Sequence, residues 1–131
     1  MTEPEPIQKA VEQFILNEID SVPHLEALLM LCNGPGREWR VDEMAKALYV
    51  PLEVGQKILQ SLAQRGLIAA VPAESETYVY VSQSEEKDTL LRAVDATYRR
   101  ELVRVSTMIH SKASPAVREF ARAFRLIKGR D

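Results

Sequence analysis

The segment 42–65 contains two short amphipathic helices that are separated by a proline. Acidic residues open the first predicted helix, 42–48, at the end where negative charge stabilises a helix. Pro51 forces the break that follows, because the residue before a proline is disfavoured in the α region. The second helix, 51–65, is followed by Gly66, which suits a helix C-cap. Its inward residues, taken from their helical spacing, are Val54, Ile58, Leu59 and Leu62.

Two further helices precede this pair. The apolar residues of segment 6–18 recur at the three-and-four spacing of an amphipathic helix. Ser21 and Pro23 then suit the N-cap and first turn of another helix, which stops at the turn-forming residues 33–36. Between residues 25 and 32 this helix has almost no polar face apart from Glu26, so we expect it to lie at the centre of the core.

Short extended segments lie on both sides of the proline-separated pair. Segment 37–41, "REWRV", carries apolar residues at alternate positions, which predicts a brief strand. Downstream, residues 67–71 are apolar, residues 72–76 form turns, and residues 77–81 alternate β-branched and aromatic side chains. These three segments together predict a β-hairpin.

The order helix, short strand, helix, tight break, helix and hairpin over 21–81 resembles the winged helix-turn-helix superfamily. The two-helix unit is "VDEMAKALYVPLEVGQKILQSLAQRGLI" and the wing is "AAVPAESETYVYV". The resemblance implies a mainly α fold of three helices and a β-hairpin wing, to which this chain adds an N-terminal helix and a long C-terminal helical extension. It further implies that helix 51–65 enters the major groove of DNA, while the wing tip reaches phosphate or the minor groove.

The outward face of helix 51–65 is the DNA-reading face in this resemblance. It consists of Glu53, Gln56, Lys57, Gln60, Ser61 and Gln64. A glutamine carboxamide can bond bidentately to adenine, and Lys57 can reach a guanine edge or a phosphate. The predicted DNA-binding residues of this helix are Gln56, Lys57, Gln60 and Gln64 on bases and Arg65 on phosphate.

Charge is unevenly distributed along the chain. The net charge is −2, but residues 1–36 carry one lysine and six acids, whereas residues 92–131 carry ten basic residues and four acids. The predicted wing tip, 72–76, holds two glutamates and no base, which leaves it unfit to touch phosphate. A last helix beginning at Ser114 adds predicted phosphate contacts from Arg118, Arg122 and Arg125. Alternatively, these arginines are solvated or pair with the acidic first 36 residues.

Residues 84–109 predict one long helix with a narrow apolar seam. The seam consists of Leu91, Val94, Tyr98, Leu102, Val105 and Ile109. Seams of this kind commonly pack against a second copy, so they predict a homodimer. Pairing of the seam with helix 6–18 of the same chain is the alternative, and both arrangements can coexist. The tail "VREFARAFRLIKGRD" resembles the ends of small bacterial proteins that join a winged domain to a helical extension, which suggests a bacterial source.

Composition is typical of a folded soluble protein. The 131 residues are 46% hydrophobic and 27% charged, enough to bury a core without disulfides. We expect three parts: an acidic lead and helix over 1–19, the winged domain over 20–82 and the helical extension over 83–131. No apolar run approaches the roughly 20 residues of a membrane span, and the first residues lack the pattern of a signal peptide. We therefore expect a cytoplasmic protein without membrane contact.

Motifs for catalysis and metal binding are missing from the sequence. One cysteine and two distant histidines cannot assemble a four-ligand zinc site, and no phosphate loop or catalytic triad motif is present. We interpret Cys32 as a small core residue and His24 as a capping or surface residue. The sequence thus predicts no enzyme and no cofactor. It favours a small DNA-binding regulator of transcription, with a protein-interaction adaptor that has lost its basic surface as the alternative.

Overall fold

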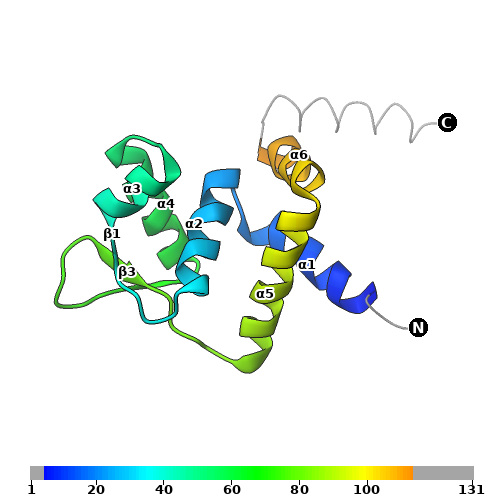
Figure 1. Cartoon of the computed structure of the whole chain (residues 1–131), viewed down its shortest axis with the longest axis horizontal. Helices are drawn as coiled ribbons and strands as arrows, with labels where there is room; N and C mark the ends of the chain where they lie inside the picture. The colour runs from blue at the N-terminus through cyan, green and yellow to red at the C-terminus, as the bar shows by residue number, and fades with distance from the viewer. Residues whose placement is uncertain (1–4, 114–131) are drawn as a thin grey trace.

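The centre of the fold is a leucine-rich helix with other elements on both sides. A computed structural model describes residues 5–113 of the chain. The elements in chain order are α1 (Glu5–Glu18), α2 (Val22–Asn33), β1 (Trp39–Arg40), α3 (Val41–Leu48), α4 (Leu52–Gln64), β2 (Ala69–Ala70), β3 (Thr77–Val79), α5 (Glu85–Arg100) and α6 (Leu102–Ala113). Helices α3 and α4 and the sheet lie on one side of α2, and α1, α5 and α6 lie on the other (Figure 1).

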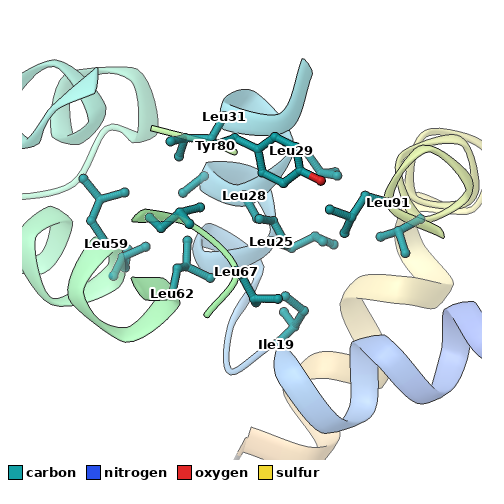
Figure 2. Close-up of a cluster of buried hydrophobic side chains, with 14 of the residues drawn as sticks. Ile19, Leu25, Leu28, Leu29, Leu31, Leu59, Leu62, Leu67, Tyr80 and Leu91 are labelled. Carbon is teal, nitrogen blue, oxygen red and sulfur yellow. The ribbon is translucent and has the colours of Figure 1, made fainter. Parts of the chain in front are cut away.

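Helix α2 has the position that its composition predicts. Ser21 caps it by accepting the backbone N–H of His24 at 3.3 Å, and Pro23 lies in its first turn. Figure 2 shows Leu25, Leu28, Leu29 and Leu31 of α2 among side chains from α4 and α5, including Leu59, Leu62 and Leu91. This single cluster joins both sides of the molecule, so the two sides share one core.

A tight turn joins α3 to α4, as Pro51 predicts. Tyr49 ends α3 in the left-handed region, at φ 58° and ψ 45°, and its N–H bonds back to the carbonyls of Ala45 and Lys46. Pro51 then occupies the N-cap of α4. The two helices pack directly against each other.

The wing is a three-stranded antiparallel sheet in the order β1-β3-β2. Trp39 pairs with Tyr78 across β1 and β3, and Ala69 pairs with Val79 across β2 and β3. The hairpin prediction is confirmed, and the predicted strand at 37–41 becomes the third strand of the same sheet. With these elements the chain has a mainly α, winged helix-turn-helix fold, as the sequence predicted.

The prediction of one long helix over 84–109 is wrong. Glu101 leaves the helical region, at φ −129° and ψ 53°, and so divides the segment into α5 and α6. Two backbone bonds bridge the break, from the N–H of Glu101 to Thr97 O at 2.8 Å and from the N–H of Val105 to Glu101 O at 3.0 Å. The bend turns α6 so that it packs against α1, α2 and α5.

The predicted dimer seam is mostly interior. Five of its six residues are buried within one chain: Leu91, Val94, Tyr98, Val105 and Ile109. Helix α1 fills the seam, because both α5 and α6 pack on it, which is the intramolecular alternative. The sixth residue, Leu102, is 51% exposed next to Val103 at 76%. The five buried residues are therefore unavailable to a second copy in this conformation.

None of the helices described between residues 5 and 113 is long and apolar enough to cross a membrane. The predicted last helix, including Arg118, Arg122 and Arg125, lies outside the described residues.

Candidate nucleic-acid interface

The solvent-facing side of α4 presents the polar residues that the sequence placed there. Glu53, Lys57, Gln60 and Gln64 are exposed, and Gln56 and Ser61 are half-buried. The opposite side is buried through Ile58, Leu59 and Leu62. The structure thus brings Gln56, Lys57, Gln60 and Gln64 together on one accessible helix face.

Val54 was predicted to point inward, and this prediction is wrong. Its side chain is 40% exposed, and the neighbouring Gly55 is buried in its place. A Cβ at Gly55 would lie 2.9 Å from the Cβ and 3.2 Å from the Cα of Ala45 on α3. The two helices therefore approach each other at a residue without a side chain. This close approach sets the position of α4 beside α3.

Arg65, which was predicted to contact phosphate, is engaged by groups of the same chain. Its guanidinium donates to the Asn17 carbonyl at 3.1 Å and pairs with Glu18 at 3.4 Å and Asp20 at 2.9 Å. Only 33% of the Arg65 side chain is exposed. Arg65 instead joins the C-terminal end of α4 to the junction between α1 and α2.

The wing tip is acidic and exposed, as its sequence indicated. Glu74 and Glu76 both lie in solvent, and Glu76 adopts a positive φ of 56° at the turn. The far end of the hairpin is attached to α5, because the hydroxyls of Tyr80 and Ser82 donate to Asp88. These two hydrogen bonds, with that of Ser82 the stronger influence, lower the pKa of Asp88. The hairpin is thus held in place, but its tip, residues 72–76, offers no positive charge to DNA.

Many cations on the other side of the molecule are paired with carboxylates. Arg104 pairs with Glu101 at 2.5 Å and with Glu12 of α1 at 3.1 Å, and Arg99 pairs with Asp95 at 3.0 Å. The Arg104–Glu12 and Arg65–Glu18 pairs neutralise part of the acidic N-terminal region. Pairing of the acidic start with basic residues further along the chain, one of the alternatives for the charge asymmetry, therefore occurs within residues 5–113.

Three cations of the winged side form no ion pair within the described part of the chain: Arg37, Lys46 and Lys57. The Arg37 guanidinium lies 3.7 Å from the centroid of the Trp39 ring, and Lys46 is exposed in the last turn of α3. Positive charge around α4 is therefore present but sparse.

A groove of about 510 Å³ lies between α2, α5 and the turn that joins α3 to α4. On one wall of this groove, the Tyr98 hydroxyl of α5 donates to Glu26 of α2 at 2.8 Å. Burial, with this bond as the second cause, raises the pKa of Tyr98 to about 12. Asn33 donates to Asp95 at 3.4 Å on the other wall. These bonds hold α5 against α2 and so fix the winged side relative to α1, α5 and α6.

Cys32 and His24, whose side chains could in principle serve catalysis or metal binding, make contacts that stabilise the fold. Cys32 packs against the core, and burial raises the pKa of its thiol to about 11, so the thiol stays protonated near neutral pH. His24 bonds through Nδ1 to the Ser21 hydroxyl at 2.6 Å, and burial lowers its pKa. Within residues 5–113, no three His, Cys, Asp or Glu side chains are grouped to hold a metal ion.

Comparison with known proteins finds similarity in fold. No family model and no curated protein matches the chain. The crystal structure of RV1404 from Mycobacterium tuberculosis aligns with 95% of this chain and 86% of its own, with a TM-score of 0.50 and 18% identity. A MarR family protein of the same organism, RV2887, aligns with 95% of this chain and 89% of its own, with a TM-score of 0.49 and 19% identity. At such identities the likeness is one of fold alone.

Proposed function

We propose that this chain is a small bacterial regulator of transcription that binds duplex DNA as a homodimer, with α4 in the major groove. The observation that carries the proposal is the accessible face of α4, where Gln56, Lys57, Gln60 and Gln64 lie together in a winged helix-turn-helix fold. Glutamine amides pair with the adenine edge, and lysine pairs with guanine or phosphate, so this face is chemically suited to bases.

Affinity for duplex DNA depends largely on cations that displace counterions from phosphates. In the proposed complex, Lys46 and Arg37 on the winged side supply part of this charge, and Arg118, Arg122 and Arg125 supply the rest. Arg65 acts indirectly, because its ion pairs with Glu18 and Asp20 hold the end of α4. The homodimer would use exposed apolar residues at the break between α5 and α6, Leu102 and Val103.

The test is fluorescence anisotropy of a labelled duplex over a range of salt concentrations. We expect binding at low salt. The logarithm of the association constant should fall linearly with the logarithm of the salt concentration, with a slope of about −3 or steeper, because each phosphate contact contributes about −0.9. Lys57→Glu with Gln60→Glu should abolish binding and leave the mass of the dimer unchanged in sedimentation. The matched control is Lys9→Glu with Gln8→Glu on the exposed face of α1, which should bind as the wild type does.

A protein-interaction adaptor is the second candidate, and the acidic wing favours it. Glu74 and Glu76 would repel phosphate at the position where winged proteins that bind DNA bring the wing close to it. The same titration separates the two functions. Duplex binding that is undetectable at low salt, or that is insensitive to salt, would exclude the DNA-binding function and leave the adaptor.

A further inference from the structure

Three large apolar side chains, one at the end of α3 and two at the start of α4, lie in solvent. Tyr49 is 95% exposed, Leu52 is 55% exposed and Val54 is 40% exposed. The core beneath them is already filled by Ile58 and Leu59 of the same helix, which are buried. These three side chains therefore contribute little to packing and are accessible to a partner.

The backbone at Tyr49 supports this view. Its φ of 58° lies in the left-handed region, where glycine or asparagine is less strained than an aromatic residue. The capping bonds of Tyr49 to Ala45 and Lys46 involve only its backbone N–H, which any residue except proline supplies. Neither the turn nor the core thus requires a tyrosine at this position.

Leu52 adjoins amide side chains of the same helix. Because α4 turns 100° per residue, Leu52, Gln56 and Gln60 follow one another at i, i+4 and i+8 along one side of the exposed face. Lys57 is the only basic side chain on this face of α4, so it is the one residue there that is suited to guanine. Glu53 can accept from the amino group of cytosine. Aliphatic and amide groups make up most of the remaining surface.

A surface of aliphatic and amide groups complements A·T base pairs in the major groove. Thymine presents a methyl group there, and adenine presents the N7 acceptor beside the N6 donor that a carboxamide matches. We propose that Leu52 contacts a thymine methyl group while Gln56 and Gln60 bond to adenine, so that α4 selects A·T-rich duplex DNA. The inference rests on the proposed function and adds the base preference of the same site.

The experiment compares two duplexes of equal length, one of A·T pairs and one of G·C pairs, by anisotropy at matched salt. The wild type should bind the A·T duplex at least tenfold more tightly. Leu52→Ser with Gln60→Ala should reduce this ratio to below threefold while the salt dependence stays the same, because the phosphate contacts are untouched. The matched control is Leu16→Ser with Gln8→Ala, which removes an exposed leucine and glutamine from α1 and should keep the ratio.

The outcomes separate the base preference from DNA binding itself. Equal, salt-dependent binding of both duplexes would overturn the A·T preference and leave the proposed function intact. A wild-type preference that survives in the Leu52→Ser, Gln60→Ala variant would overturn the assignment to these residues. Failure to bind either duplex at low salt would overturn the proposed function, and the exposed apolar residues would then belong to a protein contact.

Discussion

Arg65→Met should destabilise the fold and affect DNA binding only slightly. The guanidinium makes two ion pairs and one hydrogen bond to the junction of α1 and α2, all lost in methionine, which keeps the apolar stem. Because the groups are a third to a half exposed, each ion pair contributes only about 0.2–1 kcal/mol. The hydrogen bond to the Asn17 carbonyl adds about 1 kcal/mol. The expected loss is therefore about 2 kcal/mol of the free energy of unfolding.

Urea denaturation measures this loss. With a denaturant dependence of about 2 kcal/mol per M, the midpoint should fall by about 1 M. At 1 M salt, where the screening length is about 3 Å, the gap from the wild type should shrink to about half, because only the hydrogen-bonded part persists. Arg99→Met is the matched control. It removes a single exposed i,i+4 pair with Asp95 and should cost about 0.5 kcal/mol or less.

One result would refute this account of Arg65. If Arg65→Met unfolds at the same urea concentration as the wild type but loses about one unit of the salt slope of DNA binding, then the side chain contacts phosphate and does not join α4 to α1. That was the role which the resemblance to winged helix proteins implied.

Two further predictions concern the positions of α4 and of the wing. Gly55→Ala should lower the free energy of unfolding, measured by urea denaturation, by about 1–3 kcal/mol, because the new methyl group would meet the Cβ of Ala45 at 2.9 Å. Increased stability would mean that α3 and α4 are further apart. Asp88→Asn should lower the urea midpoint at neutral pH, because Ser82 and Tyr80 stabilise the ionised carboxylate and lower its pKa from the ordinary 3.8. A lowered folded-state pKa of Asp88 stabilises the protein above pH 3.8 and ceases to do so as the pH falls through the folded-state pKa. The difference in urea midpoint between variant and wild type should therefore close in acid. A difference that is constant with pH would contradict this cause.

Features governed by local rules were predictable from the sequence. Ser21 caps α2 and Pro51 breaks the chain before α4, because each acts on its own backbone neighbours. The exposed glutamines of α4 followed from helical spacing. The prediction that Val54 points inward was wrong, for a reason that helical spacing does not reveal. The close approach of Ala45 on α3 selects the glycine at position 55 for the interior and leaves the valine outside.

Features that depend on distant partners were not predictable. The break at Glu101 has no proline or glycine to mark it, and it serves the packing of α6 on α1 and α2. Arg65 meets Glu18 and Asp20, which lie 45 or more residues away in the chain. A helix pattern reports which face of a helix is apolar but not which neighbour covers it. The apolar seam was therefore correctly identified as a packing surface, but the choice between a second copy and the helix at 6–18 as its partner came only from the structure, where α1 covers it.

The placement of cations separates two contributions to the proposed DNA binding. On the winged side, ion pairs within the chain engage Arg40 and Arg65, so the described part of that side keeps few cations for phosphate. The exposed face of α4 is rich in amide and aliphatic groups, which discriminate among bases but displace few counterions. Base selection would then reside in α4, and most of the salt-dependent affinity would come from arginines elsewhere, including those at 118, 122 and 125. Because phosphate contacts carry no base information, substitutions in the two places should change different quantities: the ratio between duplexes for α4, and the slope with salt for the arginines.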